Sequence, residues 1–172
     1  MTRKLPNGRY CVRSGNTVPS PYLRDNISLL VGGRKNLSKI KAIDLGCGNL
    51  RNTRFLKMCG LKNITPIDMV DDCAEVLVLG RDQLPFRART INVILCNYVF
   101  MFLSPEERVR LCREINRVAA KGCTIMVELA VVKHSYLLNT VQMRHMLWRL
   151  FHLIGWERVS YSPSGRFIAR KP

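Results

Sequence analysis

The sequence predicts an α/β protein with a mostly parallel β-sheet, helices on both faces of that sheet, and a C-terminal antiparallel hairpin. Two observations lead to this prediction. From Ile40 onward, short and continuously apolar segments alternate with segments of helical periodicity. Residues 156–172 read as two strands joined through Ser-Pro-Ser-Gly. Continuous apolar strands are typical of a parallel sheet that is buried on both faces, so a three-layer sandwich is expected.

The strands and helices are expected in the following order. The predicted strands are residues 41–46, 63–70, 74–80, 91–99 and 123–131, followed by the hairpin. The predicted helices are residues 20–33, 49–60, 104–122 and 135–155. Ser20 and Ser104 can cap their helices, and each is followed by a proline that suits the first turn. Glu107 can complete a capping box with Ser104, while Gly32, Gly60 and Gly122 are expected to end helices.

The two later helices each have a predicted apolar face. In residues 104–122 that face is Leu111, Cys112, Ile115, Val118 and Ala119, with Arg108 off it. In residues 135–155 it is formed by Leu137, Leu138, Val141, Met146, Leu147, Leu150, Phe151 and Ile154. His145 and His152 lie on the polar side of that helix and are expected at the surface.

Length and charge describe one basic domain. A chain of 172 residues supports a single core, with residues 1–39 as a basic N-terminal arm and helix and residues 40–172 as one globular unit. The net charge of +16 is concentrated at the ends: +8 within residues 1–41 and +5 within residues 144–172. Such a surface attracts nucleic acid, another polyanion or an anionic membrane, although it can also serve solubility alone.

The location follows from absent signals and from the cysteines. No apolar run reaches the roughly 18 residues of a membrane span, and the N-terminus lacks the apolar stretch of a secretory signal. The seven cysteines are scattered and never spaced as Cys-x-x-Cys, which argues against a disulfide framework or a zinc site. We therefore expect a cytoplasmic protein with reduced thiols and no metal. The oligomeric state is not predicted.

The most informative segment is the turn after the first predicted strand. Gly46 and Gly48 permit a sharp turn into the next helix, whose backbone amides can face a ligand. Asp68 follows 22 residues after Gly46, the spacing of an acid that binds ribose hydroxyls. A dinucleotide site would have a further glycine at position 51, which is Arg51 here. Asp44 suits a ligand with positive charge better than a pyrophosphate. The pattern indicates a nucleoside site.

These segments resemble the class I S-adenosylmethionine-dependent methyltransferases, a family with a Rossmann-like fold. "AIDLGCGNLRNTRFL" is similar to the first motif, "ITPIDMV" to the second, and the region from "DQLPF" to "MVEL" to the third and fourth strands with their helix. The resemblance implies S-adenosylmethionine as cofactor. It implies cofactor contacts from Asp44, Gly46, Cys47, Gly48, Asp68, Met69, Asp82, Gln83, Leu84 and Asn97. Leu50 departs from the family pattern, which commonly has a glycine there.

The acceptor is open at this point. The candidates on the substrate side are Arg9, Tyr10, Arg13, Tyr22, Arg24, Tyr98 and His134. Arginines interleaved with aromatic rings can hold phosphate and stack on bases, so nucleic acid or a small anionic molecule is the expected acceptor. No catalytic residue is assigned. The alternatives are a non-catalytic protein that binds S-adenosylmethionine or nucleic acid with a degenerate methyltransferase fold, and an enzyme that degrades the cofactor.

Overall fold

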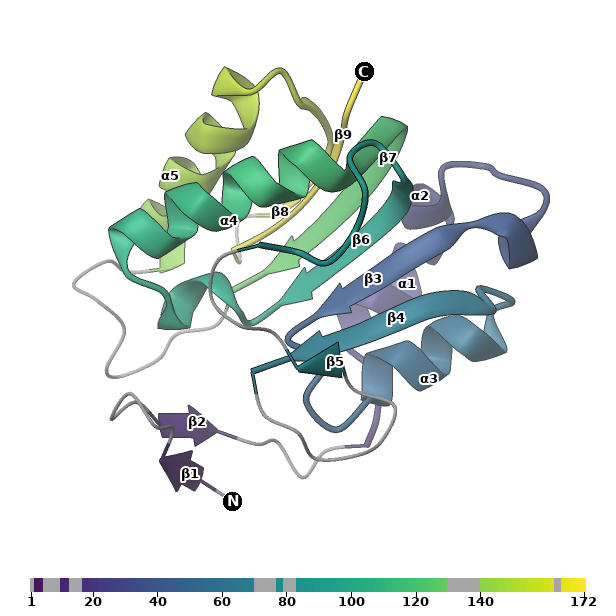
Figure 1. The fold of residues 1–172 in the computed structure, drawn as a ribbon, viewed down its shortest axis with the longest axis horizontal. Coiled ribbons are helices and arrows are strands. Elements are labelled where there is room, and N and C mark those ends of the chain that lie inside the picture. Colours follow the sequence, from purple (N-terminus) through teal and green to yellow (C-terminus); the bar gives the residue numbers. More distant parts are fainter. Residues whose placement is uncertain are drawn as a thin grey trace.

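The computed structural model describes residues 2–4, 10–12, 17–69, 77–78, 83–129, 140–162 and 165–172 (Figure 1). Its strands are β1 (Thr2–Lys4), β2 (Tyr10–Val12), β3 (Lys41–Leu45), β4 (Asn63–Asp68), β5 (Leu77–Val78), β6 (Ile91–Asn97), β7 (Ala119–Glu128), β8 (Glu157–Ser162) and β9 (Arg166–Arg170). Its α-helices are α1 (Pro21–Asp25), α2 (Ile27–Val31), α3 (Arg51–Met58), α4 (Pro105–Val118) and α5 (Thr140–Leu153). Two short 3-10 helices are η1 (Leu37–Lys39) and η2 (Phe100–Phe102).

The main sheet confirms the predicted α/β architecture. Its strand order is β5-β4-β3-β6-β7-β9-β8. Neighbours from β5 to β7 pair in parallel, whereas β9 is antiparallel to both β7 and β8. The predicted C-terminal hairpin is therefore the edge of this sheet. Strands β1 and β2 form a separate antiparallel pair in the N-terminal arm.

Helices cover both faces of the sheet and produce two cores (Figure 1). On one face α1, α2 and α3 pack against alternate sheet residues in an apolar cluster that includes Leu23, Leu30, Leu56, Val93 and Leu95. On the other face α4 and α5 pack against the intervening residues of the same strands. A residue's position within a strand therefore decides which helical layer it meets.

The predicted helix at residues 20–33 is two shorter helices. Ser20 caps α1 and Pro21 occupies its first turn, as expected, and Gly32 ends α2 in a left-handed conformation with φ of 62°. The interruption is at Asn26, which has φ of −120° and whose side-chain amide donates to the Tyr22 carbonyl at 3.0 Å. Asparagine competes for nearby backbone groups in this way, which favours helix ends.

The helix from Pro105 has the predicted capping box but differs at two other points. Ser104 and Glu107 exchange hydrogen bonds with each other's backbone. Arg108, expected off the apolar face, is buried because its Nε donates to the Phe100 carbonyl at 3.0 Å, satisfying an oxygen of η2. Gly122 does not end the helix. The chain enters β7 at Ala119, and the Gly122 amide pairs with the Lys171 carbonyl beyond β9.

The predicted face of the last helix is partly wrong. Val141 is 47% exposed, and Met143 takes the buried position on α5 beside Leu147 and Phe151. His145 and His152 are exposed, as predicted. Leu137 and Leu138 lie outside the described residues. Across the parts of the chain that the structure describes, no helix combines the length and apolar character needed to cross a bilayer.

Candidate functional site

The order of strands changes direction between β3 and β6. Strands β4 and β5 extend the sheet on one side of β3, whereas β6 and β7 extend it on the other. In open α/β sheets, ligands bind in the crevice at the carboxyl ends of the strands where such a change occurs. Gly46 directly follows β3 and Tyr98 directly follows β6, so the predicted site residues of both segments meet at this crevice.

Gly46 and Gly48 have different roles in the turn after β3. Both have positive φ, 69° and 53° respectively. A Cβ on Gly46 would lie 2.4 Å from Val99 Cγ2, so the loop after β6 requires glycine here. A Cβ on Gly48 would meet nothing within 4 Å. Gly46 therefore serves the packing of two loops, and Gly48 leaves open space for a ligand beside the backbone.

Asp68, the last residue of β4, connects this turn to the next strand. Its Oδ2 accepts a hydrogen bond from the Gly48 amide at 2.8 Å, and its Oδ1 accepts one from the Met69 amide at 2.7 Å. The Gly46 and Cys47 amides both donate to the Ile67 carbonyl. Each carboxylate oxygen has a second lone pair, so Asp68 can still accept from ligand hydroxyls. Met69 is 45% exposed beside it.

Asp44 lies beneath the turn rather than at its surface. Only 1% of the residue is exposed, and its Oδ2 accepts from the Thr53 hydroxyl of α3 at 2.6 Å. Burial raises the pKa of this carboxyl to about 7, and the nearby Asp68 charge acts in the same direction. This hydrogen bond thus links the end of β3 to α3. A negative charge on Asp44 contributes to the electrostatic potential at the turn.

Leu50 occupies the position where the sequence departs from the family pattern. It precedes α3 with φ of 65°, a left-handed conformation that favours glycine. Its side chain is 3% exposed and packs with Cys47. Leu50 therefore adopts the backbone conformation that a glycine would have in this turn, and its side chain forms a small apolar cluster with Cys47. The strain costs about 1 kcal/mol.

A polar cluster lies at the carboxyl ends of β6 and β7. Glu128 is fully buried, and its Oε1 accepts from Asn97 Nδ2 at 2.6 Å and from the Ser20 hydroxyl. Its Oε2 accepts from the Tyr98 hydroxyl at 3.2 Å and pairs with Arg166 Nε at 3.2 Å. Burial raises the pKa of the Glu128 carboxyl, and burial also raises that of Tyr98. We call these five residues the Glu128 cluster.

The backbone of the Glu128 cluster is equally constrained. Tyr98 has φ of 60°, and its amide donates to the Glu128 carbonyl at 2.8 Å. Asn97, Glu128 and Arg166 are register partners across β6, β7 and β9, so they form one row on the α1 side of the sheet. Asn97 Oδ1 is buried and accepts no hydrogen bond from the described residues. Strained residues and unsatisfied buried acceptors are characteristic of binding sites.

Glu128 is the residue that the sequence analysis missed. A single carboxylate inside the apolar segment "CTIMVELAV" was visible in the sequence. Charged residues are almost never fully buried without a partner. That anomaly, at the end of a predicted parallel strand, is the signal that points to the crevice.

The remaining predicted site residues are placed as follows. Cys47 and Leu84 are buried, and the Leu84 amide donates to Glu114 Oε2 at 2.9 Å, whereas Gln83 is exposed. Tyr22 is buried: its hydroxyl donates to Ser160 Oγ at 3.4 Å and Arg166 lies over its ring. Arg24 is exposed on α1. Tyr10 lies in β2, and Arg9, Arg13, Asp82 and His134 lie outside the described residues.

Residues 43–127 match the family model described as "Methyltransferase domain". The match spans the turn after β3, Asp68, and the strands β6 and β7. Residues 43–127 are thus a methyltransferase domain, and the chain resembles the class I S-adenosylmethionine-dependent methyltransferases. The chain is accordingly a methyltransferase with S-adenosylmethionine as its cofactor. A comparison of the sequence with curated proteins finds no match.

Solved structures of methyltransferases share the fold at low sequence identity. A methyltransferase from Archaeoglobus fulgidus has a TM-score of 0.67 and 13% identity, with 87% of this chain and 91% of that chain covered. The 1,6-didemethyltoxoflavin-N1-methyltransferase of Burkholderia thailandensis has a TM-score of 0.60 and 14% identity, covering 99% and 98%. The magnesium protoporphyrin IX methyltransferase of Synechocystis has a TM-score of 0.63 and 13% identity, covering 86% and 77%.

The turn after β3 fits this cofactor in two respects. The open space beside Gly48 allows a ligand to approach backbone amides at the start of α3. The half-buried Asp68 carboxylate retains lone pairs at the end of the neighbouring strand, where ribose hydroxyls can donate to it. The Leu50 side chain is buried against Cys47.

Proposed function

We propose that this methyltransferase alkylates a nitrogen or oxygen of an acceptor that enters at the carboxyl ends of β6 and β7. The Glu128 cluster is the observation that carries the proposal. It places the buried Asn97 Oδ1 and the hydroxyl of Tyr98 at the side of the crevice away from Asp68. An acceptor N–H or O–H can donate to these oxygens, which orients the lone pair to be methylated.

The cofactor contacts belong to the same proposal. The amino-acid part would face the turn of Gly46, Cys47 and Gly48, and the ribose hydroxyls would donate to Asp68. The adenine would lie against Met69, with Gln83 and Leu84 at its edge. Bound S-adenosylmethionine supplies a methyl group on a positively charged sulfur, so the leaving group is already activated. The work of the protein is then to orient the acceptor and exclude water.

Tyr98 and Glu128 would act on the acceptor's proton. The half-buried Tyr98 hydroxyl donates to Glu128, so its oxygen lone pairs are free to accept from an acceptor N–H or O–H. Burial raises the pKa of Glu128, which favours a carboxylate that can take up a proton. Arg166 beside it stabilises the charged form before the reaction.

The acceptor class follows from charge. Arg51 lies 5.9 Å from the ring centre of Tyr98, and Arg166 pairs with Glu128 at 3.2 Å, so two cations contact the Glu128 cluster. An anionic acceptor, either a nucleic acid or a small anionic molecule, is therefore proposed. The free thiols of Cys47, Cys59, Cys96, Cys112 and Cys123 support a cytoplasmic location, where thiols stay reduced.

The test is methyl transfer from labelled S-adenosylmethionine to panels of RNA, DNA and small anionic acceptors. We expect a labelled acceptor together with the demethylated cofactor in equal amounts. Tyr98→Phe should lower kcat about 10- to 100-fold while changing cofactor affinity less than twofold, because the removed hydroxyl faces the acceptor. Cofactor cleavage products without a labelled acceptor would instead establish degradation. Cofactor binding without any product would establish the non-catalytic alternative.

A further inference from the structure

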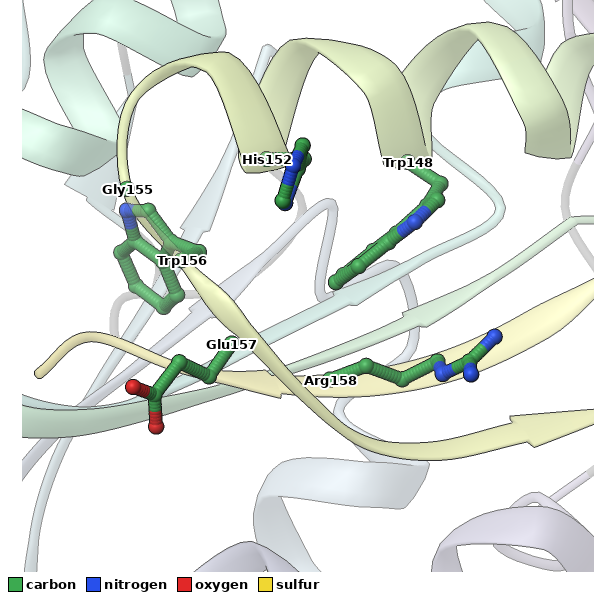
Figure 2. Close-up of a pocket in the computed structure, with 6 residues that line it drawn as sticks. All are labelled: Trp148, His152, Gly155, Trp156, Glu157 and Arg158. Atoms are coloured by element: carbon green, nitrogen blue, oxygen red, sulfur yellow. The ribbon is translucent and has the colours of Figure 1, made fainter.

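A surface pocket lies far from the crevice described above. It is formed between the end of α5 and the start of β8, is lined by Trp148, His152, Gly155, Trp156, Glu157 and Arg158, and has a volume of about 480 Å³ (Figure 2). In the sheet register, Glu157 of β8 lies opposite Arg170 of β9, and Arg170 lies opposite Thr124 near the amino end of β7. Glu128 is the last residue of β7, at the other end of that strand. The pocket is therefore at the opposite end of these strands from the Glu128 cluster.

Aromatic rings and cations alternate from this pocket along β8. The rings of His152 and Trp148 are 6.0 Å apart, and Arg158 lies 5.9 Å from the Trp148 ring and 5.4 Å from the Tyr161 ring. Arg144 lies 4.4 Å from the Tyr161 ring. We call these five residues the Trp148 strip. Figure 2 shows Trp148 and His152 descending from α5 toward β8, with the Glu157 carboxylate pointing away from Arg158.

A bulge in β8 produces this alternation. The pairing register of β8 with β9 shifts between Arg158 and Ser160. Residues three apart would ordinarily point to opposite faces of a strand, but the extra residue brings Arg158 and Tyr161 to one face. Trp148 packs edge-on against Phe167 of β9 at 6.2 Å, which fixes its ring. The strip is thus held in place by the sheet before any ligand binds.

The charge around the strip is predominantly positive. Residues 140–172 contain six lysines and arginines and a single acid, Glu157. Arg158, His145 and His152 are exposed, and Trp148 and Tyr161 are half-buried. A cationic surface that offers aromatic faces at successive positions matches a chain of phosphates with flat bases. It does not match an acidic peptide specifically, because a peptide has no regular series of rings.

We propose that the Trp148 strip binds single-stranded nucleic acid, with bases stacked on Trp148 and Tyr161 and phosphates paired with Arg158 and its neighbours. A duplex hides its base faces, so it could use only the charge of the strip. Stacking on such rings contributes about 1–3 kcal/mol for each base. The strip runs along β8 to Tyr161 on the face of the sheet that α5 covers, because Arg158 and Tyr161 pair with Ala169 and Phe167 of β9. The Glu128 cluster lies on the opposite face, beside α1, so the strip is a binding surface separate from the acceptor crevice.

The experiment measures binding of fluorescein-labelled 20-nucleotide oligo-U to the full chain by fluorescence anisotropy. Oligo-dT of equal length, a 20-base-pair duplex and uridine monophosphate are measured beside it. The variants are Arg158→Gln and Trp148→Leu, and Arg54→Gln is the matched control because Arg54 is an exposed arginine on α3 behind the other end of the sheet. Thermal unfolding shows whether each variant is folded.

Trp148→Leu should weaken oligo-U binding about 5- to 100-fold, the effect of losing one stacked base. Arg158→Gln should weaken it about tenfold and reduce the slope of log affinity against log salt by about 0.7. Arg54→Gln should change affinity less than twofold. Equal affinities for oligo-U and oligo-dT would identify the shared stacking chemistry, and preference for oligo-U would identify RNA; both outcomes support the proposal.

Two results would overturn it. One is duplex binding as tight as oligo-U binding, and the other is an equal loss from Arg54→Gln and Arg158→Gln, since both would reduce the interaction to net charge. Arg158 is exposed, so its variant remains informative even if Trp148→Leu does not fold.

A second readout is intrinsic fluorescence: oligo-U should quench Trp148 but not Trp156, which is 1% exposed and donates to Asn116 Oδ1. Cofactor affinity should be unchanged in these variants, which separates this proposal from the methyltransferase function.

Discussion

At Leu50 the backbone conformation and the side-chain environment favour different residue types. The left-handed conformation favours glycine, whereas the contact with Cys47 favours a large apolar residue. Burial of a leucine contributes about 1.5–3 kcal/mol, which exceeds the strain of about 1 kcal/mol. Leucine is therefore tolerated here, and the turn keeps its shape without glycine.

The comparison of two small substitutions tests this explanation. Leu50→Ala and Leu50→Gly both lose the buried side chain, but only glycine relieves the positive φ. We expect Leu50→Gly to be more stable than Leu50→Ala by about 1 kcal/mol in urea unfolding, the reverse of their usual order near helices. Greater stability of Leu50→Ala would show that the left-handed conformation is not adopted.

Asp44 makes the stability of the folded chain depend on pH. An aspartate in an unfolded chain has a pKa of about 3.9, and burial raises that of Asp44 to about 7. Between these values the unfolded state has lost the proton that the folded state keeps, so the free energy of unfolding falls as pH rises from about 4 to about 7. Below about pH 4 the loss is absent.

Asp44→Asn should remove this dependence. The amide oxygen can still accept from Thr53, and no charge is formed in the core. At roughly 1.4 kcal/mol for each pH unit, the variant gains at most about 4 kcal/mol relative to the parent protein between pH 4 and pH 8. Urea unfolding at both pH values measures the gain. A constant difference between the two proteins would mean that Asp44 is ionised throughout.

At the scale of elements, one serine joins the start of α1 by hydrogen bonds to both the sheet and α3. Ser20 caps α1 by accepting from the Leu23 amide at 3.4 Å, and its hydroxyl donates to Glu128. Its own amide donates to Asn52 Oδ1 of α3 at 3.0 Å. The start of α1 is therefore joined to both α3 and the Glu128 cluster, which places the N-terminal helix beside the proposed acceptor.

Ser20→Ala and Ser104→Ala form a matched pair of cap substitutions. Each should lower stability by about 0.5–2 kcal/mol, because each removes a side-chain cap. Only Ser20→Ala also removes a donor to Glu128, so only it should lower kcat of methyl transfer, by about tenfold. Denaturation and kinetics on both variants check this. Equal kcat values for the two would remove Ser20 from the acceptor side.

The predictability of the elements depended on where their structure is determined. The apolar strands and the Ser104 capping box are local patterns, and the structure confirms them. Arg108 and Val141 were misplaced because the contact of Arg108 with η2 and the course of α5 over the sheet are tertiary features. The bulge in β8 likewise follows from pairing with β9. Periodicity within one segment carries no information on such contacts.

The candidate site was predictable to the same degree. Gly46, Gly48 and Asp68 meet as expected because short motifs at strand ends converge in a parallel sheet. The cross-strand row of Asn97, Glu128 and Arg166 requires the strand order, so only its first member was identified from the sequence. The raised pKa of Asp44 depends on burial and was not predictable from its neighbours in the chain.

At the scale of the whole molecule, the charge of +16 should govern binding of polyanions. The N-terminal arm contributes Arg9 and Arg13, and Arg24 is exposed on α1. Replacing all three by glutamine should lower affinity for oligo-U and reduce its salt slope by about 2, at about 0.7 for each lost phosphate contact. Anisotropy titrations from low to high salt measure the slope. An unchanged slope would assign the contacts to other basic residues.

The proposed function depends on cofactor binding at the turn after β3. The most direct test is titration calorimetry of S-adenosylmethionine into the parent protein, Asp68→Ala and the control Asp25→Ala, which removes an exposed acid from α1. We predict binding by the parent and the control, and affinity at least tenfold weaker for Asp68→Ala, since a charged hydrogen bond contributes about 1.5–3 kcal/mol. Unchanged affinity in a folded Asp68→Ala protein, or no binding by the parent, would contradict the proposed cofactor site.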